Sequence, residues 1–270
     1  MDKKRILFVT QEIEPYTTIT AISSLMKELT MQTHKSSFEI RILMPKFGLI
    51  NERRHRLHEV VRLSGMNIII DDDDFPLIIK VASLPDSRIQ VYFLDNEEFF
   101  RRKYMFRDEE GNLFEDNDSR MVFFCKGVLE TVKKFGWAPD IVHVHGWMSS
   151  MVPLYLKKVY KDDPIYQDAK VVLSVYDNPC NIKLAPNFVE KAMINDLSQE
   201  DLDDYFENGE VILNKGAIAN SDAIIQGSHF TDENVLKLIM EQDKPFLAYD
   251  EDHYVPEIIK FYKSLLKDQF

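Results

Sequence analysis

The stretch Arg5-Ile-Leu-Phe-Val-Thr10 is a short, nearly continuous apolar run. A strand that helices cover on both faces of a parallel sheet has this composition, because neither face of the strand meets water. Working outward, residues 21–31 repeat apolar side chains at helical spacing, and residues 38–44 form a second strand-like run that ends at Pro45. Strand, helix and strand in this order predict a parallel βαβ unit.

The same alternation returns in the second half of the chain. We expect a helix that begins at Asn117 or Asp118, either of which can cap it, and runs to about Phe135, with Gly136 at its end. Further strands are expected at 140–145, 170–176 and 223–226, and helices at 149–160, 211–220, 231–241 and 256–267. The predicted fold is α/β, a doubly wound, Rossmann-like parallel sheet with its ligand site at the carboxyl ends of the strands.

Residues 57–95 interrupt the alternation. Four strand-like runs, at 57–63, 66–70, 76–84 and 89–95, follow one another without a helix and predict a small antiparallel insertion. The acidic run from Asp71 to Asp74 is interpreted as a polar turn, since it lacks the glycine and glutamate of a calcium-binding loop. With no internal repeat and no low-complexity linker, residues 1–270 are interpreted as one domain with a helical tail over 231–270.

Charge and apolar patterning exclude several classes of function. The formal net charge of −12 disfavours binding to nucleic acid or to an anionic membrane. The basic cluster Arg53 to His58 is interpreted as a solvated segment, with a phosphate or carboxylate site as the alternative. No apolar run is long enough to cross a bilayer, and the apolar start is too short for a signal sequence, so we expect a cytoplasmic protein. Cys125 and Cys180 are expected to be free thiols, which suits that compartment.

The segment Pro139-Asp-Ile-Val-His-Val-His-Gly-Trp147 places two histidines on one predicted strand. Residues two apart on a strand share a face, and His145 lies nearer the carboxyl edge, where α/β sheets bind ligands. A ligand contact and a buried structural role are both open for His145, and the structural role is favoured for His143. A zinc site is disfavoured because no third nitrogen or sulfur ligand stands at metal-binding spacing.

Three segments resemble the N-terminal domain of bacterial glycogen and starch synthases. Residues 139–147, followed by 152–156, are similar to the family's P-D-[IV]-[IV]-H-x-H-D-W strand end and the helix behind it. The second segment is Asp116-Asn117 with Arg120, Phe123 and Phe124, which follows an aromatic segment at 96–100 and resembles the family's D-N-x-x-R-F-x-[FL]-F. The third is the opening strand with Glu12 and Pro15-Tyr16, together with residues 41–45. The similarity covers roughly residues 4–230 and is faint over 215–223.

The resemblance implies one half of a two-Rossmann-domain glycosyltransferase that adds glucose from ADP-glucose to an α-1,4-glucan. It implies that His145 approaches the donor glucose and stabilises charge at the reacting carbon. The substrate-binding residues it implies are Glu12, Tyr16, Thr18, Thr20, Asn117, Trp147 and Asp177. Trp147 suits stacking on a sugar ring and equally an anchoring place in the core. The ligands implied are an α-glucan or a nucleotide sugar, with ADP-glucose as donor, and neither a cofactor nor a metal is implied.

Departures from the family pattern fall at the expected phosphate site. Residues 18–22, Thr-Ile-Thr-Ala-Ile, stand where the family has K-[TV]-G-G-L, so the lysine and both glycines that admit a phosphate are missing. Gly146 replaces the acid of the family's D-W, and residues 174–178, Ser-Val-Tyr-Asp-Asn, replace its T-[IV]-H-N loop.

The family's second Rossmann domain has no expected counterpart, because only about 44 residues follow Gln226. One hypothesis is therefore a glycosyltransferase component whose second domain comes from a separate chain. Another is a catalytically silent relative that binds glucan or regulates glycogen metabolism. A third, an unrelated α/β enzyme that uses Asp177, His145 and Glu12, rests on composition alone.

Overall fold

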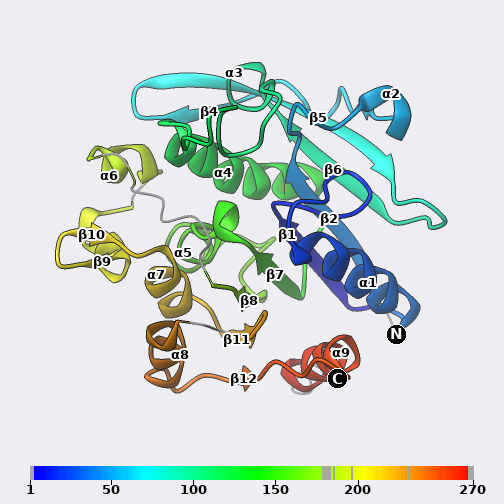
Figure 1. Cartoon of the computed structure of the whole chain (residues 1–270), viewed down its shortest axis with the longest axis vertical. Helices are drawn as coiled ribbons and strands as arrows, with labels where there is room; N and C mark the ends of the chain where they lie inside the picture. The colour runs from blue at the N-terminus through cyan, green and yellow to red at the C-terminus, as the bar shows by residue number, and fades with distance from the viewer. Residues whose placement is uncertain (1–2, 178–183, 185, 196, 230–231, 267–270) are drawn as a thin grey trace.

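A mostly parallel sheet forms the centre of the molecule, as predicted (Figure 1). The computed structural model describes residues 3–177, 184, 186–195, 197–229 and 232–266. The parallel strands are β1 (Arg5–Thr10), β2 (Glu39–Pro45), β6 (Gln90–Asp95), β7 (Ile141–His145), β8 (Lys170–Val175), β11 (Ala223–Gln226) and β12 (Phe246–Leu247). Their spatial order is β12-β11-β8-β7-β1-β2-β6.

The strand order reverses between β1 and β7. The chain leaves β1 through α1 (Ala21–Lys35) to β2 on one side, and β7 pairs with β1 on the other side. The crevice at the carboxyl ends of two such strands is where open α/β sheets bind ligands. The residues that follow Thr10 and His145 are therefore expected to border a ligand site.

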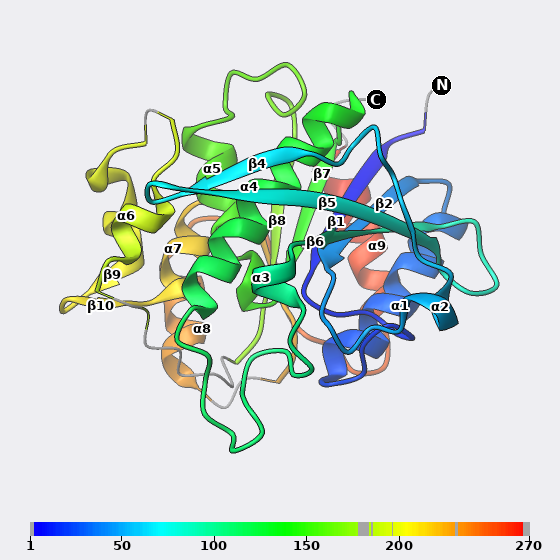
Figure 2. The same ribbon diagram turned by 90° about the horizontal axis from the view of Figure 1, so that it is seen from above.

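Helices cover both faces of the sheet, so its central strands are buried on both sides. Helices α1 and α9 (Tyr254–Leu265) lie on one face, and α4 (Asn117–Phe135), α5 (Val152–Lys158) and α7 (Leu213–Ala219) lie on the other (Figure 2). The side chains from Ile6 to Val9 are all fully buried, which accounts for the continuous apolar run of β1. The remaining helices are α2 (Glu52–His55), α3 (Glu97–Phe100), α6 (Phe188–Ala192), α8 (Glu233–Met240), η1 (Trp147–Ser149) and η2 (Gln199–Tyr205).

The antiparallel part lies at one edge of the sheet. Strands β3 (His58–Glu59) and β4 (Met66–Ile70) both pair antiparallel with β5 (Asp73–Ser83), which pairs antiparallel with β6. The predicted strand at 57–63 is wrong beyond β3, because residues 60–63 form a turn closed by Leu63 N donating to Val60 O at 2.8 Å. The run at 89–95 belongs to the parallel sheet, since β6 also pairs with β2.

Two details of the predicted helices need correction. Asp116, rather than Asn117 or Asp118, holds the N-cap position of α4, and Asn117 is its first helical residue. The predicted end is confirmed, because Gly136 adopts the left-handed conformation with φ 63°. The tail beyond residue 231 is not wholly helical. It contains β12, which extends the sheet and is too short to give a periodic signal. Before the tail, residues 206–207 (β9) and 210–211 (β10) form a small two-stranded ladder that is equally short.

Cys125 is a buried free thiol, and burial raises its pKa to about 12. Cys180 lies outside the described residues. Within the part of the chain that the structure describes, no helix is both long and apolar enough to span a bilayer.

Candidate sugar-binding pocket

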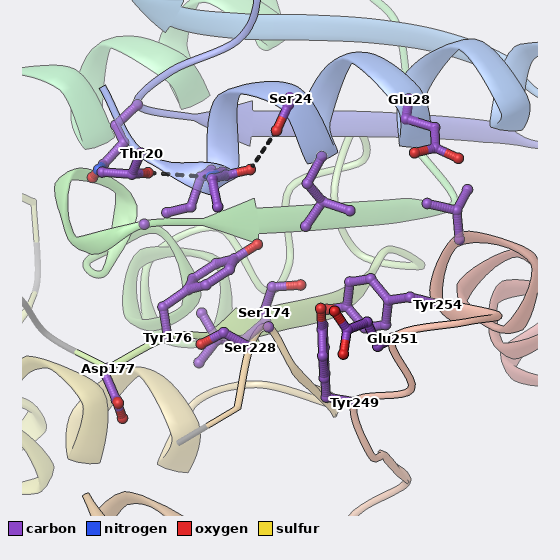
Figure 3. A pocket seen from close by; sticks show the side chains of 18 of the residues that line it. Thr20, Ser24, Glu28, Ser174, Tyr176, Asp177, Ser228, Tyr249, Glu251 and Tyr254 are labelled. Carbon is purple, nitrogen blue, oxygen red and sulfur yellow. Dashed lines mark hydrogen bonds between the residues drawn. The ribbon is translucent and has the colours of Figure 1, made fainter. Parts of the chain in front are cut away.

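A cavity of about 520 Å³ opens at the carboxyl ends of β1, β7, β8 and β11. One wall is the first half of α1, and the opposite wall is the segment 249–256 that leads into α9 (Figure 3). The residues that follow β7, β8 and β11 form its floor. The cavity therefore lies at the reversal of strand order, where the sequence predicted a ligand site.

The lining is polar, aromatic and acidic. It includes the carboxylates Glu28, Asp177, Glu251 and Asp252, the hydroxyl groups of Ser24, Ser150, Ser174 and Ser228, and the aromatic residues Trp147, Tyr176, Tyr249 and Tyr254. Among the described residues that line the cavity, none is a lysine or an arginine. Such a lining offers hydrogen bonds and ring faces to a ligand with many hydroxyl groups, and it offers no cation to a phosphate.

The carboxylate of Glu12 lies at the N-terminus of α1 and accepts hydrogen bonds there. Glu12 is fully buried, and its carboxylate accepts hydrogen bonds from Thr20 N at 2.9 Å and Thr20 Oγ1 at 2.7 Å. The hydroxyl of Thr20 in turn accepts from Ile22 N at 3.2 Å and caps the helix. A negative charge at a helix N-terminus compensates the positive end of the helix dipole. The place where the family resemblance puts a phosphate therefore already holds an anion from within the chain.

Gly146, which replaces the family's acid, occupies a backbone conformation that side chains avoid. Its φ of 79° and ψ of 161° fall in a region populated almost only by glycine. A Cβ atom at this position would lie 2.5 Å from Gln11 Oε1. An acid at this position would strain the backbone and displace the Gln11 side chain.

His145 lies behind the pocket rather than on its surface. Its side chain is fully buried, its Nδ1 is hydrogen-bonded to the Tyr176 hydroxyl at 2.9 Å, and its Nε2 has no partner in the described structure. Burial lowers the pKa of His145 to about 3, so the ring is neutral. His143 shares this face, as predicted, with its ring centroid 3.9 Å away, and bonds to Tyr262 and Ser174 at 2.5 and 2.8 Å.

Tyr176 separates His145 from the cavity. It lines the pocket while its hydroxyl bonds to the histidine. The ring packs closely against Gly227, where a Cβ atom would lie 2.4 Å from Tyr176 Cε1. Tyr176 is the third residue of the stretch that replaces the family's T-[IV]-H-N, so the departure noted in the sequence forms the cover over the histidine.

Three of the residues expected to bind substrate line the pocket: Thr20, Trp147 and Asp177. The others do not. Thr18 is exposed outside it, and Glu12 holds Thr20. Tyr16 is buried, with its hydroxyl donating to Ser83 O at 2.9 Å and its pKa raised by burial to about 12.

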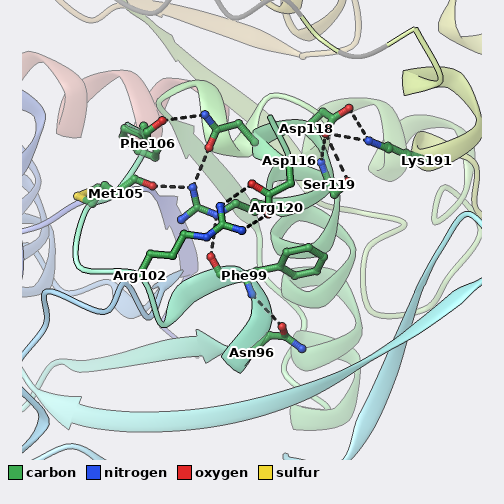
Figure 4. Close-up of polar contacts among 11 residues, drawn as sticks. Asn96, Phe99, Arg102, Met105, Phe106, Asp116, Asp118, Ser119, Arg120 and Lys191 are labelled. Carbon is green, nitrogen blue, oxygen red and sulfur yellow. Dashed lines mark hydrogen bonds and ion pairs between the residues drawn. The ribbon is translucent and has the colours of Figure 1, made fainter. Parts of the chain in front are cut away.

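Asn117 belongs to a separate network around a fully buried arginine (Figure 4). Arg120 donates to Phe99 O, Met105 O and Asn117 Oδ1 at 2.6 to 2.7 Å, and Asn117 Nδ2 donates to Phe106 O at 2.9 Å. Burial lowers the pKa of Arg120 to about 10. The D-N-x-x-R resemblance thus corresponds to a clamp that holds the backbone of residues 99–106.

The basic cluster lies away from this pocket. Arg53, Arg54 and Arg56 are exposed on and beside α2 and do not line the cavity. Among the described residues, no group of three or more His, Cys, Asp or Glu side chains is placed to hold a metal ion.

The pocket residues that sequence reasoning missed come mainly from outside the motifs. Ser24 and Glu28 lie one helical turn apart on α1, and Tyr249, Glu251 and Tyr254 belong to the tail, where the resemblance could not be mapped. Ser174 and Tyr176 did carry a sequence signal, because both stand in the altered stretch 174–178. A contact between the tail and the sheet edge had no local pattern to predict it.

Comparison with known proteins agrees with this architecture. Residues 5–243 match the family model "Starch synthase catalytic domain". Glycogen synthase of Chlorobium limicola is 41% identical over 174 residues, 64% of this chain and 36% of that protein. Glycogen synthase of Chlorobaculum tepidum is 34% identical over 250 residues, 92% of this chain and 49% of that protein. The catalytic domain of starch synthase IV from Arabidopsis thaliana, solved with ADP and acarbose bound, superposes with a TM-score of 0.77 at 16% identity, covering 92% of this chain and 51% of that one.

The parallel sheet is covered by helices on both faces and has a polar pocket at its switch point, so the domain is Rossmann-like. The chain belongs to the starch synthase catalytic domain family. It spans about half or less of the length of the relatives that it matches.

Proposed function

We propose that this chain is the glucan-binding domain of a glycogen synthase-type glucosyltransferase. The observation that carries the proposal is the cavity at the switch point, because hydroxyl-rich and aromatic side chains line it in a chain of the starch synthase family. Aromatic faces and carboxylate or hydroxyl oxygens are the groups that bind sugar rings. Trp147, Thr20 and Asp177 then contact the glucan.

Transfer of glucose from ADP-glucose to an α-1,4-glucan needs cations for the diphosphate. The described pocket lining supplies none, and Glu12 compensates the nearby end of α1. In this proposal those cations come from other parts of the full-length protein or from a separate chain that provides a second domain. His145 contributes to catalysis only in a state in which Tyr176 has moved. A cytoplasmic location suits the free thiol of Cys125.

A second candidate is a catalytically silent glucan-binding or regulatory protein of glycogen metabolism. The hydrogen bond between Tyr176 and the buried His145 favours this candidate, because it keeps the one implied catalytic residue away from any ligand in the pocket. Both candidates share glucan binding. They differ in whether glucose is ever transferred.

The test combines a binding assay with a transfer assay. Purified chain is sedimented with glycogen, and transfer of labelled glucose from ADP-glucose is followed with and without cell extract. Ser24→Trp should fill the pocket from an exposed position of α1 and weaken glycogen binding at least about tenfold. Ser264→Trp is the matched control, because Ser264 is also exposed on a helix and makes the same bond to a carbonyl three residues back.

Equal glycogen binding by Ser24→Trp and wild type would overturn the proposal. If glycogen binds as expected, label incorporation in the presence of extract supports a transferase that depends on other components. No incorporation under either condition supports the silent binding protein.

A further inference from the structure

We propose that Tyr249 is the aromatic face on which a glucose unit of the glucan stacks. The inference rests on the proposed function, because it names the residue that recognises the sugar ring in the same pocket. Tyr249 lies beyond residues 5–243, which match the family model. In this proposal the C-terminal tail of the chain therefore supplies the stacking contact.

The aromatic side chains of the pocket differ in how much of the ring can reach a ligand. Among the described residues that line the cavity, four are aromatic: Trp147, Tyr176, Tyr249 and Tyr254. Trp147 and Tyr254 are only 8% and 7% exposed. Tyr176 and Tyr249 are half-buried, so these two rings keep surface that a ligand can contact.

The hydroxyl groups distinguish Tyr249 from the other tyrosines. The Tyr176 hydroxyl is bonded to His145 Nδ1 at 2.9 Å, and the Tyr254 hydroxyl donates to Gln226 O at 2.8 Å. Within the part of the chain that the structure describes, the Tyr249 hydroxyl bonds to no other residue. Figure 3 shows this side chain projecting from the tail segment toward the α1 side of the pocket. Both its ring and its hydroxyl are thus available to a ligand.

Neighbouring groups hold the Tyr249 ring in one orientation. The ring centroids of His229 and Tyr254 each lie 4.8 Å from that of Tyr249, at interplanar angles of 70° and 53°. The backbone amide of Tyr249 donates to Gln226 Oε1 at 3.2 Å, and β12, which ends two residues earlier, pairs with β11. A stacking surface that is already ordered loses little conformational entropy when a ligand binds.

A glucose unit matches both parts of this arrangement. A pyranose ring presents C–H groups on its faces and hydroxyl groups around its edge. The C–H groups pack on an aromatic ring, and the hydroxyl groups bond to polar side chains such as Ser174, Ser228 and Asp177, which line the same cavity. The Tyr249 hydroxyl can donate to or accept from a further sugar hydroxyl.

The test compares two substitutions that both keep an apolar side chain. Tyr249→Phe retains the ring, and Tyr249→Leu does not. In isothermal titration with maltotriose, Tyr249→Phe should bind within about threefold of wild type, because it loses at most one neutral hydrogen bond. Tyr249→Leu should bind at least about tenfold more weakly, because the stacking face is gone. Proton NMR of the sugar should show C–H resonances shifted upfield by the ring in wild type and Tyr249→Phe, and no such shift in Tyr249→Leu.

The control is Tyr104→Leu, because Tyr104 is also half-buried and does not line the pocket. It should bind maltotriose as wild type does. Equal binding by Tyr249→Leu and wild type, or an upfield shift that persists in Tyr249→Leu, would overturn the inference and leave the proposed function intact. If wild type binds neither maltotriose nor glycogen, the proposed function itself fails, and the inference fails with it.

Discussion

The hydroxyl of Tyr176 lies 2.9 Å from Nδ1 of His145, and this bond closes the floor of the pocket over the histidine. The tyrosine comes from the loop after β8 and the histidine from the end of β7, two neighbouring parallel strands. The family resemblance implies that His145 contacts a sugar, whereas in this structure His145 contacts the phenol of Tyr176. Whether a ligand in the pocket can reach His145 therefore depends on this pair.

Removing the cover should expose His145. We expect Tyr176→Ala to raise the pKa of His145 from about 3 toward its ordinary value of 6.5, because water then reaches a ring that burial had kept neutral. Nuclear magnetic resonance of the imidazole carbons over a pH titration measures this change. Tyr176→Phe, which keeps the ring and loses only the hydroxyl, should leave the pKa low and reduce the free energy of unfolding by about 1 kcal/mol. An unchanged pKa in Tyr176→Ala would show that other groups bury the histidine.

The buried histidines should make the fold acid-sensitive. His143 and His145 both have a pKa lowered by burial below the ordinary 6.5, so the unfolded chain binds more protons than the folded one below that pH. The free energy of unfolding should therefore fall as the pH drops from 6.5, by about 2 kcal/mol at about pH 5 for His145, and His143 should lower it further in the same direction. Urea unfolding at several pH values measures it. His145→Gln should show a shallower dependence, and an identical dependence would refute the assignment to this residue.

Gly146 should resist substitution. We expect Gly146→Ala to lower the free energy of unfolding by about 1 to 3 kcal/mol, because its backbone conformation is one that only glycine adopts readily. The double variant with Gln11→Ala separates two causes. It removes the side chain that a Cβ atom would contact, so a full recovery of stability would contradict backbone strain as the main cause.

The buried Arg120 should contribute far more to the free energy of unfolding than the partly exposed Arg102. Arg120→Met leaves two backbone carbonyls and the Asn117 amide oxygen without a donor, and we expect a loss of about 3 kcal/mol together with faster hydrogen exchange over residues 99–106. Arg102→Gln breaks a bidentate pair with Asp116 that is about one-third exposed, so it should cost less than about 1 kcal/mol. Similar losses in the two variants would contradict the clamp.

Sequence patterns predicted the parallel sheet because each central strand is buried on both faces and flanked by turns or helices of ordinary length. The same reasoning placed His143 and His145 on one face and located the pocket at the strand ends. Local patterns failed where the structure depends on contacts distant in the sequence. The tail wall with Tyr249 and Glu251 is one such case, and the two-residue strand β12 is another. Glu12 was predicted to bind substrate, but only the fold reveals that its carboxylate holds Thr20.

A fluorescence titration tests whether a glucan binds beside Trp147. The chain has two tryptophans, and Trp137 lies away from the pocket, where its Nε1 donates to Glu39 at 2.7 Å. In Trp137→Phe the emission therefore reports on Trp147 alone. We expect a saturable change in that emission on addition of maltotriose, lost when Ser24→Phe fills the cavity and retained in Ser264→Phe. Emission that stays constant while maltotriose demonstrably binds would place the glucan elsewhere and contradict binding beside Trp147.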